Sequence, residues 1–190
     1  MPDRRDRQGR ELEFARTPSN TAHFPQSTYS GCMRRSSLPP VACRVAETLI
    51  ARGHHGVIVC PETPSLTAAE AARAMGVHPT AIITAQVFLL DDDPVLLLVA
   101  DHHHVDLVRT GKRLEGTLTP APTALVERIT GQPIDGTAPL GHPTNLPTWV
   151  DTALAAHPEV WAAGGHPNTV FRTNFRELVR ITAGLPIDID

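Results

Sequence analysis

A run of residues between positions 130 and 143 has the composition of a ligand-binding loop. It holds three glycines and three prolines. Glycine costs backbone entropy inside a helix or strand and proline removes a hydrogen-bond donor, so the run predicts a long, stiff loop. Glycine also lets a backbone N–H approach a ligand without an intervening side chain, and long ordered loops are commonly functional. The alternative is a structural crossover in which the prolines only shape turns.

Histidines are the next candidates for chemistry. His142 follows Gly141 in the loop, and His166 follows Gly164-Gly165 further along the chain. A histidine taken alone more often makes a structural hydrogen bond than a catalytic contact, but these two share a glycine context. Both are therefore candidate pocket residues.

The segment 101–106, Asp-His-His-His-Val-Asp, could suggest a metal site. Adjacent side chains point to opposite faces of a strand and diverge by about 100° on a helix, so three successive histidines rarely converge on one ion. We expect a surface junction and no metal. A metal-dependent hydrolase that uses His102, His103 and His104 is the weaker alternative.

Other catalytic and binding classes lack their sequence signatures. The chain has no Gly-x-Ser-x-Gly elbow, no P-loop and no dinucleotide fingerprint. Cys32, Cys43 and Cys60 are odd in number and form no CxxC pair, which argues against a disulfide framework and a zinc site. No run approaches the ~18 apolar residues of a membrane span, and the N-terminus has no apolar signal core. We expect a cytoplasmic protein with no membrane partner.

Charge is unevenly distributed along the chain of 190 residues. Residues 1–38 carry seven arginines and four acidic residues, whereas the remainder carries ten basic and sixteen acidic side chains. Lys and Arg contacts to phosphate dominate affinity for nucleic acid, so the acidic remainder is a poor RNA binder by itself. RNA contact should be brief, confined to one end, or helped by a partner or by the basic segment. Residues 1–37 are polar and without period, which predicts a flexible extension before a domain at 38–190.

Hydrophobic periodicity and turn residues predict a domain that mixes helices and strands. Thr67 and Glu70 fit a capping box, Asn174 fits an N-cap, and Gly184 is expected to end the last helix. Asp91-Asp92-Asp93-Pro94 is expected to be the turn of a hairpin. Helices are expected at 40–52, 67–75, 105–116, 123–129 and 175–183, a helical turn at 152–156, and strands at 57–60, 80–90, 95–100, 117–118, 148–150, 160–163 and 169–172.

The loop pattern Thr130-Gly131, then Gly136-x-x-Pro139-x-Gly141-His142, resembles the glycine-rich loop of the YbaK/prolyl-tRNA-synthetase-associated domain family. Members of that family hydrolyse wrongly charged aminoacyl-tRNA. The resemblance extends from about Val41 to Ile187 as an ordered series of weak matches. These include Val57-Ile58-Val59, Met75-Gly76, Val87-Phe88, His104-Val105-Asp106-Leu107, Val150-Asp151 and Ala162-Ala163-Gly164-Gly165-His166.

The resemblance implies a fold, an activity and a site. The fold would be α/β (α+β), with a curved, partly closed, barrel-like mixed sheet flanked by helices. The activity would be cofactor-free hydrolysis of the ester of mischarged tRNA. The partner would be the 3′ end of aminoacyl-tRNA, with an aminoacyl-tRNA synthetase as a second candidate partner. Backbone N–H groups of Gly136, Thr137 and Ala138 would bind the acyl group, because a developing oxyanion needs donors. Substrate-binding residues would be Pro139, Gly141, His142, Gly165 and His166.

One position departs from the family pattern. Active members usually carry a lysine in the pattern Ile-x-Lys-x-Leu-Val-Phe, and the corresponding residues here run from Ile82 to Phe88 with Thr84 at the lysine position. A neutral hydroxyl cannot replace a cation beside phosphate or carboxyl oxygens. Thr84 and Gln86 are both candidate site residues. Either Gln86 or an arginine elsewhere compensates for the missing lysine, or the chain is an inactive or redirected module that binds an amino-acid-like or nucleotide ligand or a synthetase.

Overall fold

The computed structural model describes residues 38–54, 57–61 and 68–189. The predicted N-terminal extension, Cys32 and the Thr67 of the predicted capping box lie outside these residues. Among the described residues no helix is both long and apolar enough to cross a membrane.

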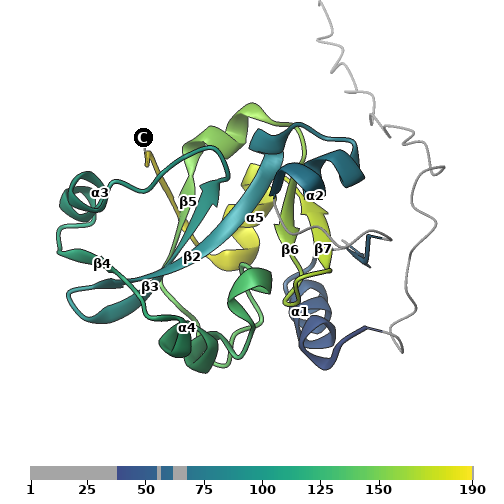
Figure 1. Cartoon of the computed structure of the whole chain (residues 1–190), viewed down its shortest axis with the longest axis horizontal. Helices are drawn as coiled ribbons and strands as arrows, with labels where there is room; N and C mark the ends of the chain where they lie inside the picture. Colours follow the sequence, from purple (N-terminus) through teal and green to yellow (C-terminus); the bar gives the residue numbers. More distant parts are fainter. Residues whose placement is uncertain (1–37, 55–56, 62–67, 190) are drawn as a thin grey trace, which may run out of the picture. The chain divides into compact units, whose positions relative to one another are not determined.

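Eight strands of the described residues form one mixed sheet. Strand β4 is attached to β2 beside the main path (Figure 1). The order along the sheet is β1-β7-β6-β2-β3-β5-β8. The hairpin β2–β3 is antiparallel, whereas β6 joins β2 and β5 joins β3 in parallel. The strands are β1 (Ile58–Val59), β2 (Ile82–Leu90), β3 (Asp93–Ala100), β4 (Leu118–Pro120), β5 (Thr148–Asp151), β6 (Val160–Ala163), β7 (Val170–Thr173) and β8 (Leu185–Ile187).

Strand β2 is paired unequally on its two sides. On one side it pairs with β3 from Ile83 to Leu90. On the other side β6 pairs only with Ile82 and Ile83, and β4 pairs only with residues 88–90. The sheet is therefore split along this side of β2, between residues 84 and 87.

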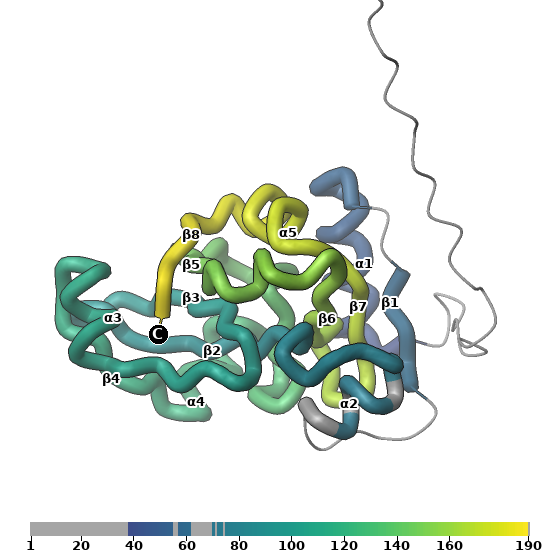
Figure 2. The backbone as a smooth tube through the Cα atoms, turned by 90° about the horizontal axis from the view of Figure 1, so that it is seen from above, coloured from purple at the N-terminus to yellow at the C-terminus, as the bar shows by residue number. Residues whose placement is uncertain are grey.

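The helices cover the two faces of the sheet according to their apolar residues. Side chains of α1 (Pro40–Ala51), α4 (Thr123–Thr130) and α5 (Phe175–Thr182) join the largest core cluster with one face of the sheet. Side chains in and next to α3 (Leu107–Arg113) join one smaller cluster, and side chains of α2 (Ala68–Met75) join another. Both clusters include alternate residues of the same strands. Figure 2 shows α1 and α5 on one side of β6 and β7 and α2 on the other.

The expected mixed sheet flanked by helices is confirmed, and the sheet is open rather than closed. The hairpin turn is shorter than predicted, because Asp93 and Pro94 already belong to β3. The turn itself consists of Asp91 and Asp92, which both have positive φ. The left-handed residue after α5 is Ala183 rather than Gly184. Asn174 is the predicted N-cap, accepting a hydrogen bond from the N–H of Glu177 at 3.0 Å. Strand β8 was not predicted.

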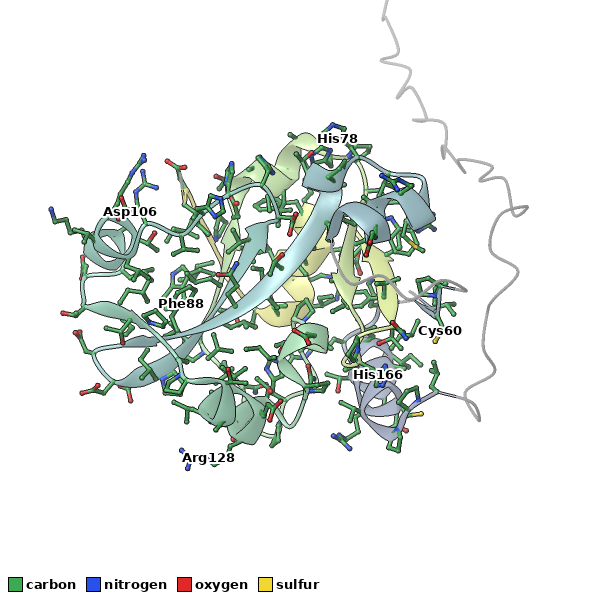
Figure 3. The ribbon with its side chains drawn as sticks, viewed as in Figure 1. Cys60, His78, Phe88, Asp106, Arg128 and His166 are labelled. Carbon is green, nitrogen blue, oxygen red and sulfur yellow. The ribbon has the colours of Figure 1, made fainter. Side chains whose placement is uncertain are left out.

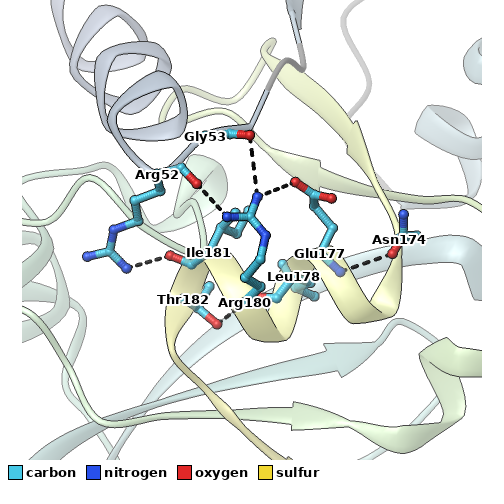
Figure 4. A network of polar contacts seen from close by, with 8 residues as sticks. All are labelled: Arg52, Gly53, Asn174, Glu177, Leu178, Arg180, Ile181 and Thr182. Atoms are coloured by element: carbon cyan, nitrogen blue, oxygen red, sulfur yellow. Dashed lines mark hydrogen bonds and ion pairs between the residues drawn. The ribbon is translucent and has the colours of Figure 1, made fainter.

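Two arginines join the C-terminal ends of α1 and α5 (Figure 4). The Arg180 guanidinium donates to the carbonyl oxygens of Arg52 and Gly53, at 2.6 and 3.4 Å. The Arg52 guanidinium donates in return to the carbonyl oxygen of Ile181 at 2.5 Å. Terminal helix carbonyls have no partner within the helix, so these contacts satisfy them and fix α1 against α5.

Two glycines allow separate loops to pack on the same point of α1. A Cβ on Gly165 would lie 2.8 Å from Cγ2 of Val45, and a Cβ on Gly141 would lie 3.0 Å from the same atom. Both glycines also have positive φ, +95° and +84°. Helix α1 thus holds the loop at 130–143 and the turn at 164–169 in fixed positions.

Replacement of Gly165 by alanine tests this close packing, and Gly76→Ala is its matched control. Gly76 also has positive φ, but a Cβ there meets nothing within 4 Å. We expect Gly76→Ala to lower the free energy of unfolding by about 1 kcal/mol through backbone strain alone. Gly165→Ala should cost about 1–3 kcal/mol more because it overpacks against α1. Equal losses in urea denaturation would contradict the packing argument.

Candidate functional site

A cleft of about 550 Å³ opens where the sheet is split beside β2. Every residue of β2 from Ile82 to Phe88 lines it. The opposite walls come from the ends of α2, β4 and β6, the start of β7, helix α4 and two loops. They include Met75, Pro120, Ala121, Val126, Ile134, Asp135, Thr137, Trp161, Ala162, Ala163, Pro167, Asn168, Thr169 and Val170. Figure 3 labels Phe88 on β2 and His166 on the turn between β6 and β7.

A short polar strip runs along the β2 wall. Thr84 and Gln86 lie on it one strand repeat apart, and the Thr84 hydroxyl donates to the Asp101 carboxylate at 3.2 Å. Asp101 directly follows β3, and its N–H donates to the Ile82 carbonyl at 3.1 Å. Sequence reasoning missed Asp101 as a site residue, although the hairpin register brings the residue after Ala100 beside the start of β2.

The charge of the cleft is negative. Its lining contains two ionisable side chains, Asp101 and Asp135, and no Lys, Arg or His from the described part of the chain. The other walls are largely apolar, with Phe88 and Val126 toward β4 and Met75 and Trp161 toward α2. A cationic group carried by a compact ligand fits this lining better than a phosphate does.

The three backbone amides predicted to bind an acyl oxygen are engaged within their own loop. The N–H of Gly136 donates to the Pro133 carbonyl at 3.0 Å, and that of Thr137 donates to the Ile134 carbonyl at 3.4 Å. The N–H of Ala138 donates to the side-chain oxygen of Gln132 at 2.7 Å. Of the three residues, only Thr137 lines the cleft. The predicted role would require these hydrogen bonds to break.

Gln132 is a second residue that sequence reasoning missed. Its side chain is 2 % exposed. Besides accepting from Ala138, it donates to the Leu140 carbonyl at 3.1 Å. The buried side-chain amide of Gln132 therefore joins two points of the loop, Ala138 and Leu140. Its oxygen and its nitrogen both have partners, as buried polar groups require. A glutamine between glycine and proline gives no local sign of this role.

The remaining predicted binding residues support the walls without lining the cleft. Pro139 is buried, and His142 contacts the Ala138 carbonyl through Nε2 at 2.9 Å. Burial lowers the pKa of His142, and the positive charge of nearby Arg52 lowers it further. The hydrogen bond to the Ala138 carbonyl acts in the opposite direction and raises the pKa. The net lowering of the pKa favours the neutral imidazole, and it donates to the carbonyl.

The second predicted glycine and histidine pair also acts through its turn. Gly136 can approach the backbone of His166 because it has no Cβ. A Cβ on Gly136 would lie only 2.4 Å from the His166 carbonyl carbon. The N–H of His166 donates to the Thr169 hydroxyl at 3.1 Å, and this hydroxyl donates back to the His166 carbonyl at 2.8 Å. Gly165 and His166 thus shape a turn whose next residues, Pro167 to Thr169, line the cleft.

The three successive histidines do not converge. His103 Nδ1 lies 2.8 Å from the carboxylate of buried Asp151, which also accepts from the N–H groups of Ala100 and Ala153. The ring of His102 leans against that of His103. Within residues 38–54, 57–61 and 68–189, no three His, Cys, Asp or Glu side chains are grouped as a metal site.

Comparison with known proteins relates this architecture to a family. Residues 62–181 match the family described as the aminoacyl-tRNA editing domain. The fold is similar to the crystal structure of a putative trans-editing enzyme for prolyl-tRNA synthetase, with a TM-score of 0.78 and 37% identity over 81% of this chain and 99% of that one. A comparison with curated proteins gives no match.

Two further solved structures share the fold. One comes from a study of computational epitope grafting on scaffold proteins, with a TM-score of 0.77 and 35% identity over 80% of this chain and 99% of that one. The other is a hypothetical protein, with a TM-score of 0.72 and 25% identity over 77% of this chain and 98% of that one. The family match covers more than half of the chain, and the chain therefore belongs to the aminoacyl-tRNA editing domain family.

Proposed function

We propose that this protein hydrolyses the ester bond of mischarged aminoacyl-tRNA in trans. The observation that carries the proposal is the cleft at the split edge of β2 in a chain of the editing family, since its lining includes the position of the family lysine. The solved relative at 37% identity, a putative trans-editing enzyme for prolyl-tRNA synthetase, points to the same class of substrate.

The polar strip can position the water that attacks the ester. Asp101 is fixed by the Thr84 hydroxyl at 3.2 Å, so its carboxylate can hold a water in the cleft and accept a proton from it as a general base. The water oxygen bonds to the acyl carbon, the bond from that carbon to the ribose oxygen breaks, and a proton passes to the leaving ribose oxygen. A free amino acid and an uncharged tRNA result.

The acidic lining limits what can enter the cleft. An aminoacyl ester carries an α-ammonium group, which Asp101 and Asp135 would attract. The tRNA phosphates are excluded by the same charges, so the 3′ end alone should enter. Affinity for the rest of the tRNA would then come from elsewhere, either from a partner such as a synthetase or from the arginine-rich residues 1–38.

A binding module without catalysis is the second candidate. Thr84 at the position of the family lysine favours it, because a hydroxyl cannot supply the positive charge of an ammonium group. Such a module would keep the cleft and bind an amino-acid-like or nucleotide ligand without turning it over. The two candidates differ in one measurable property, which is release of amino acid from charged tRNA.

Incubation with a panel of mischarged tRNAs should show release of amino acid from at least one of them. Asp101→Asn should lower kcat/KM by about 100-fold or more, because the isosteric amide is a poor proton acceptor. Asp92→Asn, the same change in the exposed hairpin turn, is the matched control and should retain wild-type activity. Lack of release from every member of the panel by the full chain would exclude the hydrolase.

The variant Thr84→Lys separates the two candidates. The new ammonium would lie next to Asp101, pair with it and withdraw it from the water, so an active wild type should lose at least about tenfold in kcat/KM, equal to about 1.4 kcal/mol. Activity that appears only in Thr84→Lys would identify the natural protein as a binding module.

A further inference from the structure

The backbone groups of β2 alternate between its two neighbours. In an antiparallel pair, every second residue exchanges both of its hydrogen bonds with the partner strand. The N–H of Asp101 donates to the carbonyl of Ile82, so the even-numbered residues of β2 face β3. The N–H and C=O of the odd-numbered residues therefore point to the other side of β2, where the sheet is split.

The split contains two odd-numbered residues, Ala85 and Val87, of which Val87 is buried and Ala85 is half-buried. Ile83 pairs with Ala162 of β6, and Leu89 pairs with Thr119 of β4. Neither register reaches Ala85, and no described residue forms a hydrogen bond with its N–H or its C=O. Ala85 lines the cleft and is half-buried. Backbone groups in such a place are seldom left unsatisfied, so a ligand or water must complete them.

An aminoacyl ester has the donor and the acceptor that can pair with the C=O and the N–H of Ala85. Its ammonium and its ester carbonyl are attached to one α-carbon, in the same arrangement as the N–H and C=O of an amino-acid residue. A hydrogen-bonded antiparallel pair requires one donor and one acceptor on each side, and peptides bind open sheet edges through this pairing. Two carboxylates in the cleft, Asp101 and Asp135, complement the positive charge of the ammonium.

We propose that the aminoacyl group of the substrate binds to Ala85 as a strand of one residue. The Ala85 carbonyl accepts from the α-ammonium, and the Ala85 N–H donates to the ester carbonyl oxygen. This inference rests on the proposed function and deepens it. The carbonyl oxygen becomes negatively charged when water adds, so the Ala85 N–H supplies the oxyanion donor that Gly136 and Ala138 do not offer.

Removal of the single N–H tests the assignment. Ala85→Pro deletes the donor and leaves the β3 ladder intact, because Ala85 does not bond to β3 and proline is tolerated where its nitrogen faces away from a partner strand. We expect Ala85→Pro to lower kcat on a mischarged tRNA by about 100- to 1000-fold. Ala85→Ser, which keeps the N–H, should retain activity far above that of Ala85→Pro. Ala85→Pro within threefold of the wild type would overturn the inference.

A measurement on the natural chain avoids any folding defect of the proline variant. Nitrogen-15 NMR would follow the Ala85 amide during titration with adenosine that carries an amide-linked amino acid at its 3′ position. We expect a downfield shift of the Ala85 amide proton and exchange slowed at least tenfold. If the wild type hydrolyses tRNA esters and Ala85 does not respond, the inference is wrong and the proposed function stands. If Ala85 responds and no ester is hydrolysed, the hydrolase is wrong and the binding mode stands.

Discussion

Unequal pairing of one strand opens the cleft of this molecule. Strand β2 is fully paired with β3 on one side, but on the other side β6 holds only its beginning and β4 only its end. A rigid strand with a short unpaired stretch presents backbone donors and acceptors in fixed positions, which costs little reorganisation when a ligand binds. The cleft is the space left by this split, and the other elements serve as its walls.

The loop glycines of the site pack closely against other backbone and side chains and do not line the cleft. Gly141 and Gly165 allow two loops to approach Val45 of α1, and Gly136 allows those loops to approach each other. Buried Gln132 then closes the first loop from within. These contacts place Thr137 on one wall and Asn168 on another without any of the loop glycines lining the cleft. A rigid frame of this kind is what a site built on an open strand needs.

Most elements could be predicted from the sequence because their signals are local. Alternation and β-branched residues located β2, β3 and β6, and the N-cap at Asn174 began the last helix where expected. The site was harder, since Thr84 and Gln86 were placed in the cleft by resemblance, whereas Asp101 and Ala85 depend on strand register. The loop amides illustrate the limit, because composition shows a glycine-rich loop but not which carbonyls already accept its N–H groups.

A crystal structure of the protein with a stable amide-linked aminoacyl adenosine would test the central claim most directly. The account predicts that the amino acid lies in the split of the sheet, with its ammonium on the Ala85 carbonyl and its acyl oxygen on the Ala85 N–H. It also predicts that the N–H groups of Gly136 and Ala138 keep their internal partners. An acyl group held instead by those loop amides, with Ala85 untouched, would contradict it.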